Sequence, residues 1–328
     1  MTARFGESRQ NSSRTPIVAF LLTAFCLWGT GIVKAQSTSA PGAAVGLDQQ
    51  GWLKDVSAWR AQREKEIDAP DGWLTLVGLE WLKPGVNTVG AAADNQIRIA
   101  AHAPDHIGVF SVSGDGVQFA PPASGFPADL QLDGQAPHEG PLKIDDLTPS
   151  VLTWHGLSLI VLNRAGRFVL RIKDAGAPTR TAFHGLNWYA PDPAFRVEAR
   201  WIPYTPARIE KIPTVLGNTL DLPSPGVAEF TLYGKTLRLE PVLEDPHGKT
   251  LFFILRDQTR YDTTYQAARF LHTEFPDHGL GQPGQLTLDF NRLENPPCAY
   301  TPYATCPLPP EFNRLLIRIE AGEKRYTP

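Results

Sequence analysis

Short runs in which apolar and polar residues alternate fill most of the chain from residue 73 onward. Segments such as 108–113 (GVFSVS), 116–120 (GVQFA) and 167–174 (RFVLRIKD) have the period of two that is typical of half-buried strands. Turn signals separate the segments, for example Gly114-Asp115-Gly116 and Asp133-Gly134. Many short strands at this spacing predict an antiparallel β-sandwich over residues 73–180.

One segment near the N-terminus has a helical period instead. In residues 51–67, Trp52, Val56 and Trp59 fall on one face of a helix, and Pro70 follows its end. We interpret the tryptophans as a stripe that docks the helix onto the next domain. The residues before the helix are small and polar, as in a linker, so residues 36–72 are expected to form a linker and one N-terminal helix.

Residues 1–35 have the three parts of a secretory signal peptide. These parts are a basic region with Arg4, Arg9 and Arg14, the apolar segment 17–28, and the cleavage site Val33-Lys34-Ala35. The apolar segment is short for a bilayer span, and an uncleaved anchor is the alternative interpretation. We expect cleavage after Ala35 and a secreted or periplasmic protein with no membrane association after cleavage.

The composition excludes several classes of function. The formal net charge is −3, and loss of residues 1–35 removes four basic residues and one acidic residue, which gives −3 − 3 = −6. A mildly acidic chain without a basic run is a poor nucleic-acid binder. The chain has no HExxH, CxxC or GxSxG motif and its eight histidines are scattered. We therefore expect no metal, no cofactor and no Ser–His–Asp triad, while the oligomeric state does not follow from the sequence.

Residues 181–328 also contain mostly strand patterns. Apolar and polar residues alternate in 195–202, and further strands are expected at 208–215, 226–234, 235–245 and 249–259. The last three are expected to form a meander, with a turn at 246–248 between the second and the third. Residues 285–291 and 315–320 are expected to complete the sheet, and the pattern allows a short helix around 264–271.

Residues 286–310 (LTLDFNRLENPPCAYTPYATCPLPP) begin as a strand and then contain six prolines. Each proline lacks an N–H and fixes φ, so regular structure cannot continue through them. A segment of this kind must be held by side chains, and we interpret it as a loop that carries a site. The polar residues expected to hold it are Asp289, Asn291, Asn295, Tyr300, Tyr303 and Asn313.

The same loop contains both cysteines that remain after cleavage, Cys298 and Cys306, because Cys26 is lost with the signal peptide. An even number of cysteines in an oxidising compartment favours a disulfide between them. This disulfide would stiffen the loop. A redox-active or metal-binding thiol pair is the alternative, for which a spacing of seven intervening residues is atypical.

The string DFN…NPPCAY…CPLPP…N…AGEK, together with residues 256–271 (RDQTRYDTTYQAARFL) and 313–326 (NRLLIRIEAGEKRY), resembles the bacterial domain of unknown function 1684 family. The resemblance covers about the last 140 residues, the size of one domain, and implies no particular reaction. One stretch of the family has the pattern D-T-x-G-x-E-T-Y-G-G-G-R, which is matched here by Asp257, Thr259, Thr264, Tyr265 and Arg269. Departures occur at Asp262 or Thr263, where a Glu is usual, and at Ala267 and Ala268, where glycines are usual.

In the first half, the rhythm L…PG.NTVG…NQIRI…HIGVF…LDGQ…LKIDDL resembles a forkhead-associated domain. In that family an Arg follows the glycine and binds a phosphothreonine, whereas Ala91 follows Gly90 here. The resemblance therefore implies the sandwich fold without phosphopeptide binding. The fold class predicted for the whole chain is mainly β. An FHA-like sandwich at 73–180 precedes a second β-rich domain with a proline-rich loop at 181–328.

Polar residues at strand ends are the candidates for a site. Asp257 and Asp289 could form a carboxylate pair for general acid–base chemistry, with Arg269 as an anchor for an anionic group. In the alternative interpretation each Asp accepts backbone N–H groups in an Asx turn, and Arg269 pairs with one of them inside the fold. The expected ligand-binding residues are Arg256, Thr264, Tyr265, Arg269, Asn291, Asn295, Tyr300 and Asn313.

Three functions agree with this pattern. The first is a secreted protein that binds a small ligand or glycan in a polar pocket of the C-terminal domain, and it is favoured because no motif specifies a reaction. The second is a hydrolase or lyase that uses Asp257 and Asp289 with Arg269. The third is a cell-envelope assembly or interaction protein that binds partners through its first domain. The sequence leaves open whether the chain is an enzyme.

Overall fold

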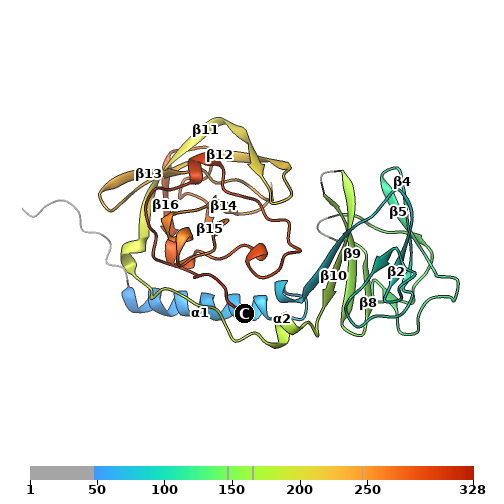
Figure 1. Cartoon of the computed structure of the whole chain (residues 1–328). Coiled ribbons are helices and arrows are strands. Elements are labelled where there is room, and N and C mark those ends of the chain that lie inside the picture. Colours follow the sequence, from blue (N-terminus) through green and yellow to red (C-terminus); the bar gives the residue numbers. More distant parts are fainter. Residues whose placement is uncertain (1–47, 146–147, 165, 246) are drawn as a thin grey trace, which may run out of the picture. The chain divides into compact units, whose positions relative to one another are not determined.

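The computed structural model describes residues 48–328 except residues 146–147, 165 and 246. The predicted signal peptide and most of the predicted linker lie outside the described residues. Strands predominate in the described part, and its α-helices are α1 (Gln49–Ile67) and the short α2 (Pro178–Thr181), so the mainly β prediction is confirmed (Figure 1). Within those same residues, no helix has both the length and the apolar character needed to cross a membrane.

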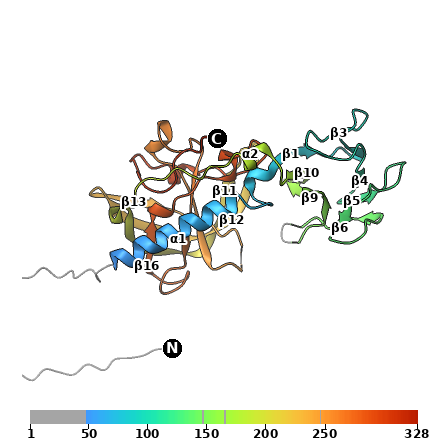
Figure 2. The ribbon, with the colours of Figure 1, turned by 90° about the horizontal axis from the view of Figure 1, so that it is seen from below.

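Helix α1 forms where the apolar period predicts it. Asp48 caps its start by accepting the backbone N–H of Gly51 at 3.1 Å, and the helix ends before Pro70. Its buried face contacts the C-terminal half, since the Trp52 indole N–H donates to Asp289 at 2.8 Å and the Arg63 guanidinium donates to the Asn295 carbonyl at 2.9 Å. The helix runs along that half in the view from below (Figure 2). Trp52 therefore has a docking role, but the helix docks onto the C-terminal half and not onto the next domain as expected.

The first half of the described chain is a sandwich of two five-stranded sheets around one apolar core that includes Val89, Phe110 and Leu159. All pairs are antiparallel except β2 with β3. The apolar side of each alternating strand faces this core, as the period of two predicts. The predicted segment 142–147 forms no strand in its described part, and β7 lies just before it. One sheet has the strand order β1 (Leu76–Trp81), β10 (Arg167–Asp174), β9 (Leu157–Arg164), β8 (Val151–Trp154) and β6 (Gln131–Leu132). The other has the order β3 (Ile97–Arg98), β2 (Gly85–Gly90), β4 (Gly108–Ser113), β5 (Gly116–Ala120) and β7 (Gly140–Pro141).

The C-terminal half contains a four-stranded antiparallel sheet and a separate two-stranded one, which share a core that includes Trp201, Phe230, Phe253 and Phe290. The larger sheet has the order β13 (Lys235–Leu239), β12 (Thr219–Leu232), β11 (Arg196–Pro213) and β16 (Gly284–Asp289), and the smaller one pairs β14 (Thr250–Leu255) with β15 (Arg269–Glu274). Single 3₁₀ turns fill many of the connections: η1 (Trp73–Thr75), η2 (Pro193–Phe195), η3 (Gln258–Tyr261), η4 (Phe290–Arg292), η5 (Pro297–Ala299) and η6 (Glu311–Asn313).

Several predictions for this half are wrong about the bounds, the pairing or the type of an element. The expected strands 195–202 and 208–215 are one strand, β11. The meander stops after β12 and β13, because β14 pairs with β15 instead of β13. The helix allowed around 264–271 does not form, since a strand begins at Arg269. The apolar residues of β14 are buried, and pairing with β15 satisfies its backbone, which outweighs the helix propensity of Ala267 and Ala268.

The alternating segment 315–320 is extended but is not a strand of the described sheets, which corrects the prediction. Leu315, Ile317 and Ile319 face the core, as their period of two predicts. Its backbone groups bond instead to a neighbouring turn: the Gln258 N–H donates to the Ile317 carbonyl at 2.8 Å. Side chains supply the other partners of this segment, since the Ile319 N–H donates to Asp257 and the Ile319 carbonyl accepts from Arg269.

Candidate functional site

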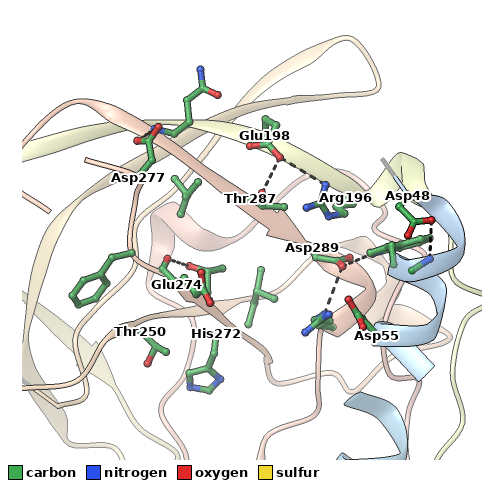
Figure 3. Close-up of a pocket in the computed structure, with 18 residues that line it drawn as sticks. Asp48, Asp55, Arg196, Glu198, Thr250, His272, Glu274, Asp277, Thr287 and Asp289 are labelled. Atoms are coloured by element: carbon green, nitrogen blue, oxygen red, sulfur yellow. Dashed lines mark hydrogen bonds and ion pairs between the residues drawn. The ribbon is translucent and has the colours of Figure 1, made fainter. Parts of the chain in front are cut away.

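A cavity of about 900 Å³ opens in the C-terminal half, between the first turns of α1 and strands β11, β15 and β16 (Figure 3). Its wall carries many more carboxyl groups than cationic ones. Arg196, Arg292 and His272 are the basic residues that line it. The carboxyl groups come from Asp48, Asp55, Glu198, Glu274, Asp277 and Asp289.

Asp289 ends strand β16 and is held on both carboxylate oxygens. One oxygen accepts the backbone N–H and the side-chain amide of Asn291, at 3.1 and 2.9 Å. The other accepts the Trp52 indole N–H at 2.8 Å, with the Arg292 guanidinium 3.7 Å away. The first pair of bonds is the Asx turn of the alternative interpretation, so that interpretation is confirmed for Asp289. The side chain joins helix α1 to the end of a strand at the edge of the cavity.

Other carboxylates around the cavity are less engaged. Asp277, in the turn between β15 and β16, accepts the backbone N–H of Gln285 at 2.8 Å, and this bond lowers the pKa of the Asp277 carboxyl. Glu198 accepts the Thr287 hydroxyl at 2.8 Å. Asp55 on α1 and Glu274 at the end of β15 are exposed, and neither carboxylate has a hydrogen-bond or ion-pair partner within the described chain. The cavity therefore offers hydrogen-bond acceptors that the protein itself leaves unused.

His272 lines the same cavity and is held by Phe252 of the neighbouring strand and by Glu244. Its ring stacks on Phe252 with ring centroids 4.6 Å apart and an interplanar angle of 9°. Its Nε2 lies 3.3 Å from Glu244. The ring is consequently fixed in orientation at one side of the cavity.

The other predicted catalytic carboxylate, Asp257, is in a closed environment. Asp257 and Arg269 are each 1% exposed and pair at 2.8 Å. Asp257 also accepts the backbone N–H and the hydroxyl of Thr259, at 2.8 and 2.6 Å, as an Asx turn. Arg269 donates to the carbonyl groups of Ile319 and Ala321. The structure brings Asp257 and Arg269 together inside the fold and places Asp289 at the cavity, with different partners.

The predicted ligand-binding residues mostly bind the chain itself. Thr264, Asn291, Asn295, Tyr300 and Asn313 are buried. Asn291 exchanges two bonds of 2.9 Å with the backbone of Asp192. Asn313 donates to the carbonyls of Glu240 and Ile254 and accepts the Glu240 N–H. These side chains replace the backbone pairing that the irregular segments lack.

The remaining candidates are also away from the cavity. The Tyr265 hydroxyl donates to the Cys298 carbonyl at 2.9 Å, and Thr264 shares a hydroxyl bond of 2.7 Å with Thr259. Arg256 is half-buried, and burial, with Arg260 and Arg314 nearby, lowers the pKa of its guanidinium. Tyr303, expected to hold the loop, is 36% exposed. Of the polar candidates named from the sequence, Asp289 is the one that lines the cavity.

Sequence reasoning missed Glu323, which is buried at 1% exposure beneath the proline-rich loop. It accepts the backbone N–H and side-chain amide of Asn295 at 2.9 and 2.7 Å, and the Tyr300 hydroxyl. Arg63 of α1 lies 4.0 Å from it. Burial raises the pKa of Glu323 to about 7. The signal was present in the AGEK string, which contains an acid among small residues. The pocket residues Asp55 and Glu274 carry no comparable signal.

The predicted disulfide is not present in the structure, where Cys298 and Cys306 are free thiols. The two residues are nevertheless in contact, since the backbone N–H of Cys298 donates to the Cys306 sulfur at 3.1 Å. The loop is held without the bridge by Asn295, Tyr300 and Glu323.

Comparison with known proteins places this half of the chain in a family. The model of the family described as "Protein of unknown function (DUF1684)" matches residues 181–324. A solution NMR structure of an uncharacterized protein of Haloarcula marismortui is 33% identical over 44% of this chain and 78% of that chain, with a TM-score of 0.38. No curated protein matches. The chain belongs to the DUF1684 family through its C-terminal half, which is the half that contains the acidic cavity.

Proposed function

We propose that the protein binds a small glycan or similar polar ligand in the cavity of its C-terminal half. The observation that supports this most is the set of carboxylates around about 900 Å³ of space, two of which, on Asp55 and Glu274, have no partner within the described chain. Carboxylates accept hydrogen bonds from hydroxyl and amine groups, which sugars present in number. The cavity has the size of typical ligand sites.

The charge of the cavity wall narrows the class of ligand further. Six carboxyl residues face two arginines and one histidine. Like charges repel across a shared site, so the cavity disfavours phosphate- or carboxylate-bearing ligands and favours neutral or amine-bearing ones. Trp52, Leu271 and Leu286 add apolar surface to the wall, which suits the apolar face of a sugar ring.

The hydrolase or lyase hypothesis draws no support from this geometry. It needs Asp257, Asp289 and Arg269 around one substrate. Asp257 and Arg269 are each 1% exposed and are paired with one another, whereas Asp289 holds helix α1 at the cavity. Nothing among the described residues favours the envelope-assembly hypothesis over the binding one.

We also propose that residues 1–35 direct the chain to the periplasm or outside the cell, where glycans are available as ligands. Their basic, apolar and small-residue parts support this localisation. We propose in addition that the first half has a forkhead-associated-like fold. Its sequence rhythm and its core between two sheets support this.

The test is calorimetric titration of the purified mature protein with three sugars of equal length. They are a trimer of N-acetylglucosamine, its deacetylated amine form and a trimer of galacturonic acid. We expect binding of the first two, strongest for the amine form, and none of the acid. Glu274→Gln should weaken binding by about tenfold, because a hydrogen bond to a charged acceptor is lost.

Glu139→Gln is the matched control, since Glu139 is an exposed glutamate of the sandwich and does not line the cavity. It should leave the dissociation constant unchanged. Absence of binding for all three sugars, or equal affinity of the Glu274→Gln variant and the unchanged protein, would contradict the proposal.

A further inference from the structure

Cys298 and Cys306 form an unequal pair of thiols in the proline-rich loop. Cys298 lies in the 3₁₀ turn η5 and is half-buried, whereas Cys306 is 4% exposed. The backbone N–H of Cys298 donates to the Cys306 sulfur at 3.1 Å, so the two residues face one another across seven intervening residues. The Tyr265 hydroxyl reaches the same turn and donates to the Cys298 carbonyl at 2.9 Å.

The surroundings give the two sulfurs different acidities. The hydrogen bond with the Cys306 thiol lowers the pKa of Cys298, burial opposes this, and the Tyr265 hydroxyl adds to the lowering. The same thiol–thiol bond, together with burial, raises the pKa of Cys306. A thiolate is the attacking form in exchange with disulfides, and the more accessible sulfur meets a reagent first. Both criteria select Cys298 as the attacking residue and Cys306 as the resolving one.

A second cavity lies beside this pair. It has a volume of about 520 Å³. Its wall includes Cys306, the apolar residues Phe252 and Phe270, and the charged residues Arg171 and Glu244, while Cys298 lies just outside the lining, eight residues before Cys306. A wall that mixes apolar, cationic and amide side chains can receive the organic group of a small or peptidyl disulfide. The cavity is distinct from the acidic one, because the two share no lining residue among those described.

We propose that Cys298 and Cys306 are a thiol–disulfide exchange site whose substrate is a small or peptidyl organic disulfide. This proposal is independent of the ligand proposed for the acidic cavity. The Cys298 thiolate attacks one sulfur of R–S–S–R′. The S–S bond of the reagent breaks, the mixed disulfide Cys298–S–S–R forms, and R′–S⁻ leaves and takes a proton from water. The Cys306 thiol then gives its proton to water, and its thiolate attacks the Cys298 sulfur. The Cys298–Cys306 disulfide forms and R–S⁻ leaves. Two protein thiols are oxidised and the organic disulfide is reduced to two thiols.

The experiment uses the full mature chain and oxidised glutathione, followed by alkylation and intact-mass measurement. The unchanged protein should lose two hydrogens and end as an internal disulfide, and reduced glutathione should restore both thiols. Cys306→Ser should accumulate one bound glutathione, because nothing resolves the mixed disulfide. Cys298→Ser should acquire glutathione slowly, because Cys306 is buried and its thiol is weakly acidic.

Tyr265→Phe separates a positioning role from a purely structural one. Loss of the Tyr265 hydroxyl should slow iodoacetamide alkylation of Cys298 at pH 7 by about threefold, because that hydroxyl helps to lower the pKa of Cys298 and the thiolate is the reacting form. Tyr261→Phe is the matched control, because Tyr261 is 69% exposed and should not change the rate.

Three results would overturn the proposal. One is an internal disulfide that reduced glutathione cannot open, which would make the bond a permanent structural one. Another is glutathione trapped on Cys306 in Cys298→Ser faster than on Cys298 in Cys306→Ser. The third is two thiols that stay free in oxidised glutathione while the same buffer oxidises a small dithiol.

Discussion

The buried carboxylates of Asp257 and Glu323 and the open carboxylates of Asp55 and Glu274 lie in one structural unit with opposite surroundings. Asp257 accepts three hydrogen bonds besides its ion pair with Arg269, and Glu323 accepts three as well. The open pair accepts none from the described chain. The same chemical group therefore holds irregular backbone in one region and remains available to a ligand in the other.

The difference shows what the family motifs do in this fold. Asn295, Tyr300 and Glu323 come from the strings NPPCAY and AGEK, and they bind one another beneath the proline-rich loop. Prolines remove backbone donors, so carbonyl and amide groups in such a segment need side-chain partners. The specific motif residues are therefore mainly structural here. The candidate binding wall is made by residues outside these two strings, although it includes Asp289 of the DFN string.

The largest expected effect comes from Arg269→Met. The change leaves the Asp257 carboxylate buried without its cation, which should lower the free energy of unfolding by about 3–5 kcal/mol. Urea unfolding followed by tryptophan fluorescence measures this value. Lys211→Met is the control, because the Lys211–Asp221 pair at 3.3 Å is exposed and should contribute less than about 1 kcal/mol. Equal stability of the two variants would remove the distinction between buried and open carboxylates.

The next effect is a pH dependence from Glu323. Its pKa of about 7 in the folded state lies above the ordinary value of 4.5, so folding favours the protonated form. Its contribution to stability is complete below pH 4.5 and is lost as the pH rises through 7, a change on the order of 3 kcal/mol. The stability of the unchanged protein relative to Glu323→Gln should therefore fall between pH 5 and pH 8.

Urea unfolding of both proteins at pH 5, 6, 7 and 8 measures this difference. Glu311→Gln serves as the control, because Glu311 is exposed. The free energy of unfolding of this variant should have the same pH dependence as that of the unchanged protein. A constant difference between Glu323→Gln and the unchanged protein across the range would show that Glu323 does not titrate there.

A smaller effect is expected for Trp52→Phe, at the border between the two regions. A smaller aromatic ring remains, but the indole N–H that donates to Asp289 at 2.8 Å is lost, which should lower the free energy of unfolding by about 1–3 kcal/mol. Trp59→Phe is the control, since the Trp59 ring packs edge-on against Trp188 and its nitrogen has no hydrogen bond within the described part of the chain. Equal losses in the two variants would mean that ring packing, and not the bond to Asp289, holds the helix.

The smallest effect on stability is expected for Glu274→Gln. Its carboxylate has no partner in residues 48–328 as described, so the free energy of unfolding should change by less than about 0.5 kcal/mol. Calorimetric titration with the amine-bearing trimer should nevertheless show weaker binding. A loss of stability comparable to that of Arg269→Met would place Glu274 among the structural carboxylates.

The sequence by itself determined the local structure of this protein. The period of two determined most of the strand segments, because side chains on a strand alternate between core and solvent, although segment 315–320 has the period without being a strand. The spacing of Trp52 and Val56 determined helix α1. The sequence also identified Asp289, Asn291 and Asn295 as important, because a proline-rich segment requires side-chain partners, and Asp257 as a polar residue at the end of a strand.

Only the tertiary structure decided which elements pair and which carboxylates meet. Strand β14 joined β15 and not β13, and Asp257 was separated from Asp289, because partners distant in sequence compete for each buried backbone group. Asp55 and Glu274 came together at one cavity from a helix and a strand 219 residues apart (274 − 55 = 219). No local sequence pattern predicts that these two residues share a cavity, because an exposed polar residue at a cavity has the same local pattern as any other exposed polar residue.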